Sequence, residues 1–299
     1  MKRHITKMPA WAAAAALAAG ALAVLSCGTA PEGTNEASSQ YFPVDLGDKW
    51  SYDTFNLTRD PNRANVFYTQ VSIENVAPVN GGTPKPTFVT KYAKGANGEN
   101  LRLNQAGYWV NKDIYFKRDY FDYGQGNNYF YLHGYQYLNE YREGVIGGYF
   151  EDKDGNRIPM VLFKTPFQVG VTWDVFDRGN PDPEGSPTIL RDVSQKTYFG
   201  LLNDMDHDGR EDFTDISIVG SIEGRELVEL YNGKQINCYR IVLKQHLVFH
   251  LTHDGDVTDD SDTTYWVAEN YGFVKTRWYE NSDYLDTVEM VLRDWWFIK

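Results

Sequence analysis

The chain has 299 residues, of which 15% are aromatic, and a formal net charge of −12 at pH 7. This acidic balance makes the chain as a whole a poor candidate for binding nucleic acid or anionic lipid head groups, because both are negatively charged. The length allows one large domain or two small ones. Two cysteines do not make a disulfide framework.

The first 26 residues have the organisation of a secretory signal peptide. Basic residues at positions 2, 3 and 7 precede an apolar run over residues 11–25, which is short for a membrane span. The run ends in Val-Leu-Ser-Cys at residues 24–27, which resembles the lipobox of bacterial lipoproteins. In that family the chain is cleaved before the cysteine, whose thiol then carries diacylglycerol. The alternative is an ordinary secretory signal followed by an incidental cysteine.

The lipobox resemblance implies an extracytoplasmic protein that is anchored to a membrane through lipid on Cys27. Gly28 stands where inner-membrane lipoproteins usually have Asp, so the resemblance implies the outer membrane of a host that has one. The small, polar and acidic residues up to position 40 predict a flexible tether over residues 27–40. Without the three positive charges of the signal peptide, the charge becomes −12 − 3 = −15.

The remaining chain is patterned for β-strands. Short alternating runs such as 71–74, 88–92 and 238–244 are separated by turn pairs such as Asn232-Gly233 and Asp254-Gly255. Long helical periodicities are scarce. We therefore expect a mainly β fold, an antiparallel curved sheet or open barrel, with Cys238 packed as a small apolar residue in a strand.

An internal repeat suggests two related β units. Residues 42–52 (FPVDLGDKWSY) and 165–175 (TPFQVGVTWDV) share the spacing P-x3-G-x2-W. Each segment predicts a turn that enters a strand: Pro sets φ, Gly allows a tight corner and Trp begins an inward-facing row. We expect a first unit at residues 41–160 and a second at residues 161–299.

These segments are similar to those of a broad group of bacterial lipoproteins. The mature chains of that group open with F-P-L-x-x-G-x-x-W-x-Y, often repeat the P-x3-G-x2-W segment, and end with a strand like Y-A-x-G-V-G-x-V-K. Residues 265–275 (YWVAENYGFVK) match this last pattern only in part. The resemblance implies fold and location, and it implies no chemistry.

The first unit contains a tyrosine-rich insertion. Residues 115–150 hold 13 Tyr or Phe among 36 residues, interleaved with Gly and Asn. We expect strands whose aromatic side chains cover a curved sheet. The alternative is a sugar- or ligand-binding surface, because such rings stack on flat apolar faces.

The sharpest local motif is an acidic segment in the second unit. Residues 204–215 (DMDHDGREDFTD) have the form D-x-D-x-D-G-x-x-D, with another Asp at the twelfth position. Calcium takes six to eight oxygen ligands, and this spacing wraps a chain round one ion. The expected ligands are carboxylates and one backbone carbonyl, that of Arg210: Asp204, Asp206, Asp208, Arg210, Asp212 and Asp215.

The flanks of this segment look like strands, and Glu211 stands where an EF-hand has an apolar residue. The segment is therefore more similar to the calcium loops of thrombospondin type 3 repeats. The alternative is a solvated acidic hairpin. A second acidic run at residues 254–262 lacks regular spacing and predicts a polar turn. Nearby, His246 and His250 would lie about 13 Å apart on one strand face, too far apart to share a metal ion.

No catalytic motif is evident. The G-x-S-x-G, H-E-x-x-H and phosphate-loop patterns do not occur. Acidic pairs such as Glu223 and Glu226 occur by chance in a chain with 41 acidic residues. We expect a non-enzymatic binding or structural module of the cell envelope, with membrane attachment through its lipid and a glycan, lipid or envelope protein as partner. A polysaccharide hydrolase and a carrier of an apolar ligand remain alternatives.

Overall fold

The computed structural model describes residues 41–42, 45–58, 60–64, 66–76, 85–94, 101–103, 109–111, 116–123, 129–139, 144–149, 158, 160–176, 189–194, 206, 208–210, 212–280 and 286–296. These residues form sixteen strands, and fourteen of them belong to one sheet. Among the described residues, no helix is long and apolar enough to cross a membrane.

The first half of the chain supplies nine strands: β1 (Lys49–Asn56), β2 (Phe67–Val76), β3 (Lys85–Lys94), β4 (Leu101–Leu103), β5 (Trp109–Asn111), β6 (Phe116–Tyr123), β7 (Tyr129–Asn139), β8 (Gly144–Tyr149) and β9 (Met160–Lys164). The second half supplies seven: β10 (Thr172–Asp174), β11 (Leu190–Ser194), β12 (Phe213–Glu229), β13 (Gln235–Leu251), β14 (Gly255–Ala268), β15 (Gly272–Glu280) and β16 (Asp286–Trp296).

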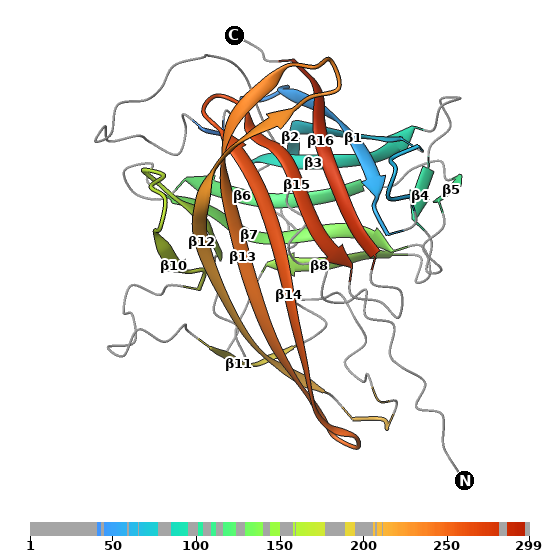
Figure 1. Cartoon of the computed structure of the whole chain (residues 1–299). Helices are drawn as coiled ribbons and strands as arrows, with labels where there is room; N and C mark the ends of the chain where they lie inside the picture. Colours follow the sequence, from blue (N-terminus) through green and yellow to red (C-terminus); the bar gives the residue numbers. More distant parts are fainter. Residues whose placement is uncertain are drawn as a thin grey trace.

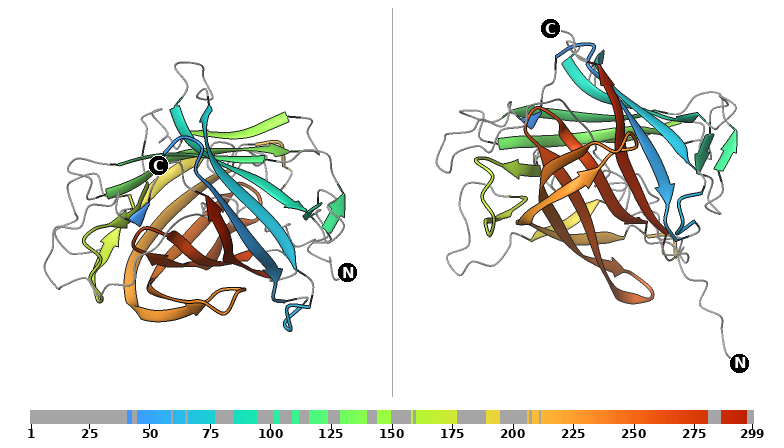
Figure 2. Two further views of the ribbon diagram at one scale, coloured as in Figure 1. Left: turned by 90° about the horizontal axis from the view of Figure 1, so that it is seen from above. Right: turned by 45° about the horizontal axis from the view of Figure 1, so that its top comes forward.

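All described strand pairs of the large sheet are antiparallel, in the order β10-β12-β13-β14-β15-β16-β1-β2-β3-β6-β7-β8. The long strands β12 to β16 run down the front of the molecule, while β3, β6, β7 and β8 cross behind them (Figure 1). From above, the front strands curve beneath the flatter back strands (Figure 2). The prediction of a mainly β, antiparallel curved sheet is confirmed.

The two ends of the sheet are joined by single hydrogen bonds. Strand β9 pairs with β7 at one end, and β12 lies near the other end. Between them, Val175 N donates to Ile218 O of β12 (3.0 Å), and Val161 N of β9 donates to Val175 O (2.7 Å). The indole Nε1 of Trp173 also donates to Val161 O (2.9 Å). The residues after β10 therefore link both ends without a continuous ladder.

The two P-x3-G-x2-W segments form turns with the same hydrogen bonds. Gly47 N donates to Ile73 O, and Ile73 N donates to Asp48 O. In the second copy, Gly170 N donates to Ile222 O, and Ile222 N donates to Val171 O. Both glycines have a positive φ, 98° and 90°, which a side chain would strain.

The two tryptophans also occupy equivalent places. Trp50 pairs with Val71, two residues before Ile73, and Trp173 pairs with Gly220, two residues before Ile222. Both indole rings are buried. The repeat therefore specifies the same turn and strand entry twice within one continuous sheet.

The core is centred on Phe42, the second described residue after the predicted tether. Its ring stacks on Phe130 of β7 (4.7 Å between centroids) and Phe163 of β9 (5.0 Å), and it tilts against Phe273 of β15 (5.2 Å). Tyr41 packs on Phe167 beside it (4.3 Å). Tyr41 and Phe42 therefore pack between the front and back strands and contact both.

The chain from residue 265 to 275 is a hairpin and not one strand. Its first residues end β14, a turn follows at residues 269–271, and β15 begins at Gly272. Asn270 and Gly272 both have a positive φ, 56° and 64°. The polar turn residues inside the segment therefore separate two antiparallel strands.

Candidate functional site

The acidic segment docks on the turn between β13 and β14. The Asp206 carboxylate accepts the backbone N–H of His253 (2.7 Å), and Asp212 Oδ1 accepts that of Thr252 (3.0 Å). Asp208 Oδ2 accepts the Thr252 hydroxyl (2.7 Å). Three of the carboxylates predicted as ligands therefore converge on two adjacent residues of one turn.

Local hydrogen bonds shape the segment itself. Asp206 Oδ1 accepts from Asp208 N (3.2 Å), and Asp208 Oδ1 accepts from Arg210 N (2.8 Å). Gly209 has φ of 89°, as the motif requires. Desolvation acts to raise the pKa of Asp206, but hydrogen bonds from the backbone N–H groups of His253, Asp208 and Asp254 lower the pKa below its ordinary value. Asp206 is thus ionised at neutral pH.

Asp215, the twelfth residue of the motif, contacts a histidine of β13. It lies in β12, largely buried, with Oδ1 3.5 Å from Nε2 of His250 on β13. Asp204 lies outside the described residues. Within the described residues, no three Asp, Glu, His or Cys side chains are grouped as they would be round a metal ion. Calcium would therefore have to draw the carboxylates closer together than their hydrogen bonds to the hairpin hold them.

The prediction of a polar turn at residues 254–262 is wrong. Only residues 252–254 turn, and residues 255–262 begin strand β14. Three of its aspartates lie opposite basic or imidazole side chains of β13: Asp256 opposite His250, Asp260 opposite His246 and Asp262 opposite Lys244. Asp260 Oδ1 lies 2.7 Å from His246 Nδ1, and Asp256 Oδ1 lies 2.9 Å from His250 Nδ1. The two histidines bind separate carboxylates.

The remaining predicted features are the lipid anchor, the tyrosine-rich stretch, the second cysteine and the acidic pair. Cys27 and the tether lie outside the described residues. The tyrosine-rich stretch contributes β6, β7 and β8 to the sheet, as expected of a strand-forming segment. Cys238 is a buried free cysteine in β13. Glu223 is ion-paired with Arg240 (2.8 Å), and the neighbouring acid Glu226 accepts the indole N–H of Trp266.

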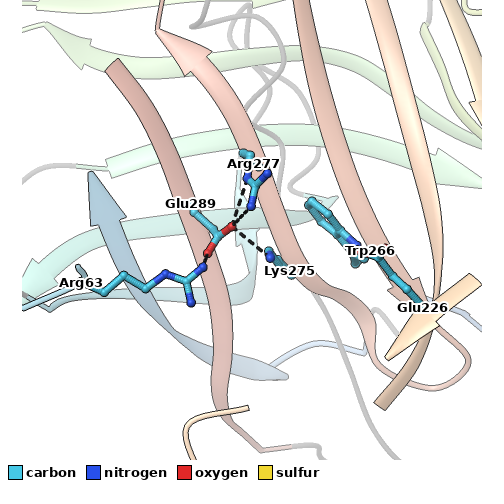
Figure 3. A network of polar contacts seen from close by, with 6 residues as sticks. All are labelled: Arg63, Glu226, Trp266, Lys275, Arg277 and Glu289. Atoms are coloured by element: carbon cyan, nitrogen blue, oxygen red, sulfur yellow. Dashed lines mark hydrogen bonds and ion pairs between the residues drawn. The ribbon is translucent and has the colours of Figure 1, made fainter. Parts of the chain in front are cut away.

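A second polar site, unnoticed in the sequence, surrounds Glu289 (Figure 3). This residue of β16 lies on the face opposite the Phe42 core, and its carboxylate is fully buried. It accepts Arg277 Nη2 (2.6 Å) and Nε (3.1 Å), Lys275 Nζ (3.0 Å), and Nη2 of Arg63. Arg63 comes from the turn between β1 and β2, and the other two cations come from β15.

Aromatic rings support these cations. Lys275 Nζ lies 4.5 Å and Arg277 Cζ 5.6 Å from the Trp266 ring centroid, and Arg63 Cζ lies 5.2 Å from that of Phe55. Burial acts to raise the pKa of Glu289, but the charge of Lys275 and the hydrogen bonds from Arg277 and Lys275 bring the pKa below its ordinary value. The sequence hints at this cluster only through β15, where alternation places Lys275 and Arg277 on one face. The contact between Arg63 and Glu289 depends on how the sheet curls, which the sequence pattern does not reveal.

Comparison with known proteins gives little further help. No family model matches the sequence, and no curated protein matches it. Two solved structures were found. One is described as a "putative lipoprotein" from Parabacteroides distasonis ATCC 8503, at 14% identity and a TM-score of 0.39, covering 86% of this chain and 99% of the other.

The other is described as a "putative exported protein with YmcC-like fold" from Bacteroides fragilis NCTC 9343, at 12% identity and a TM-score of 0.33, with the same coverage. At these TM-scores neither likeness carries an argument about fold or function.

Proposed function

We propose that this chain is a lipid-anchored, extracytoplasmic β protein of a bacterial envelope, a non-enzymatic binding or structural module with one structural calcium site. The observation that carries the calcium site is the convergence of Asp206, Asp208 and Asp212 on the turn at Thr252 and His253. A D-x-D-x-D-G sequence supports it, because the same spacing supplies oxygen ligands in known calcium loops.

The role of calcium would be to tie the acidic segment to the β13–β14 hairpin. Several carboxylates lie within one short segment, and their mutual repulsion disfavours the docked conformation. Backbone N–H groups of the turn offset part of this repulsion, and a divalent cation would offset more. Asp204, Asp206, Asp208 and Asp212 with the Arg210 carbonyl would hold the ion, and Asp215 would join them only by leaving His250.

The attachment to the membrane rests on the signal peptide and on the place of Phe42. The lipobox implies lipid on Cys27, and several acyl chains anchor a protein durably, since each buried methylene contributes about 0.8 kcal/mol. The domain begins to pack at Tyr41 and Phe42, directly after the predicted tether. The carrier alternative gains no support, because Phe42 occupies the space between the two sets of strands.

Melting curves test the calcium site. The full chain in a non-ionic detergent is heated with calcium, with magnesium and with a chelator, alongside Asp206→Ala and Asp208→Ala variants. Calcium at about 100 times its Kd adds about 2.7 kcal/mol, so Tm should rise by roughly 5–10 °C. Asp262→Asn, which removes an exposed carboxylate of β14 outside the segment, is the matched control.

The rise should be lost in the two segment variants and kept in the control. A Tm that does not respond to calcium in the unsubstituted chain contradicts the site. Anchoring is tested separately: labelled palmitate should be incorporated into the unsubstituted chain, and a Cys27→Ser variant should accumulate as an unlabelled precursor.

A further inference from the structure

The three cations round Glu289 exceed the negative charge that they surround. Arg63, Lys275 and Arg277 contribute three positive charges, and Glu289 contributes one negative charge because its pKa is lowered. Glu226 lies on the other side of Trp266, whose indole N–H it accepts. With Glu226 counted, the charges of these five side chains sum to 3 − 2 = +1, in a chain whose net charge is −12.

Two of these cations are open to solvent. The side chains of Arg63 and Arg277 are 44% and 39% exposed, whereas that of Lys275 is 16% exposed. Arg277 directs Nε and Nη2 to the same carboxylate oxygen, and Arg63 directs Nη2 to the other. A guanidinium has five N–H donors, so the contacts made within the described part of the chain leave donors of both arginines for a further acceptor.

The arrangement is held in place before any ligand arrives. Glu289 fixes the inner ends of the cations, and the rings of Trp266 and Phe55 support their flat faces. The turn at residues 60–63 positions Arg63 through a hydrogen bond from its backbone N–H to Asp60 O (3.0 Å). Side chains that are already ordered lose little conformational entropy on binding, which favours affinity.

We propose that Arg63 and Arg277, organised by Glu289, form a binding site for an oxyanion group, a phosphate in the first place, on the outer face of β15 and β16. Guanidinium groups match phosphate oxygens through paired N–H donors, which a single ammonium group does not. The phosphate can be free in solution or belong to the head group of an anionic lipid. This site is independent of the proposed calcium site.

The test measures the thermal stability of the full chain in non-ionic detergent at constant ionic strength. Inorganic phosphate and glycerol 1-phosphate, a lipid head-group analogue, are titrated against chloride. The variants are Arg277→Gln and Arg63→Gln. Arg240→Gln is the matched control, because Arg240 lies on β13 of the same sheet, is 40% exposed and forms an ion pair with Glu223.

We expect a saturable rise in Tm with phosphate, a loss of apparent affinity of at least about tenfold in both site variants, and no change in Arg240→Gln. Arg63→Gln keeps the test valid if Arg277→Gln does not fold, because Arg63 lies in a turn. A tighter response to glycerol 1-phosphate assigns the site to a lipid head group, and an equal response assigns it to free phosphate. The proposal is overturned if neither anion acts differently from chloride, or if Arg240→Gln loses the response as well.

Discussion

The indole ring of Trp173 lies directly on Gly220 of the neighbouring strand. A Cβ atom built on Gly220 would come within 2.1 Å of Cε2 of Trp173. The residues pair in register between β10 and β12, so the absence of a side chain at 220 makes room for the ring. The same ring donates to Val161 O and thereby links β9 to β10.

Gly220→Ala should therefore destabilise the protein. The new methyl group meets a ring that is held by its own hydrogen bond, and overpacking of this kind costs about 1–3 kcal/mol. Urea unfolding followed by tryptophan fluorescence measures the loss. Gly224→Ala on the same strand is the control, because a Cβ there meets nothing within 4 Å. Equal stability of the two variants would contradict the close packing.

Glu289→Gln should be strongly destabilising. It leaves three cations without their shared carboxylate, and breaking a buried ion pair from one side costs about 3–5 kcal/mol. Because Arg63 and Arg277 are partly exposed, we expect the unfolding free energy measured in urea to fall by about 3 kcal/mol, the lower end of that range. Glu229→Gln, an exposed acid on β12, should change the free energy of unfolding little. A loss below about 1 kcal/mol would mean that solvent screens the network.

The contribution of Glu289 should depend on pH. Its folded-state pKa is lowered from 4.5, so its stabilisation is fully present above that value and is lost as pH falls through the lower folded-state pKa. The difference in unfolding free energy between the unsubstituted chain and Glu289→Gln should be constant near neutral pH and should shrink in acid. Urea titrations from neutral to acidic pH measure this difference in unfolding free energy. A difference that grows in acid would contradict a lowered pKa of Glu289 in the folded protein.

Cys238 should not react in the folded protein. Burial is the main cause that raises the pKa of its thiol far above the ordinary value, and the charge of Glu226 raises the pKa further. The thiolate is the reactive form, so little of it is present at neutral pH. A chromogenic thiol reagent should give no signal from native protein and one equivalent after unfolding in urea. Rapid labelling without denaturant would show that the strand opens locally at this position.

Asp212→Ala should destabilise the protein even in the presence of a chelator. Asp212 is fully buried and accepts Thr252 N, so its removal leaves a backbone donor of the turn without that acceptor. Thr252 is exposed, so water can replace part of the lost bond, and we expect a loss of about 1 kcal/mol. Asp254→Ala, an exposed residue of the same turn, serves as the control. Thermal melting with chelator present separates this structural role from calcium binding, and equal Tm values for the two variants would contradict it.

Features that depend on a few neighbouring residues could be predicted from the sequence. The turns at Gly47 and Gly170 follow from local conformational limits, and the burial of Trp50 and Trp173 follows from alternation along a strand. The β class follows from short alternating runs between turn residues. The lipobox and the D-x-D-x-D-G segment are likewise local, and their roles remain predictions.

Features that depend on partners distant in the chain were decided by tertiary structure alone. Residues 255–262 became a strand because His246, His250 and the rest of β13 lie opposite their acidic side chains. Arg63 reaches Glu289 because β16 pairs with β1, which closes a separation of 226 residues. Local sequence specifies which way a strand's side chains alternate, but the register and curl of the sheet decide which charges meet, and long-range pairing carries no local signal.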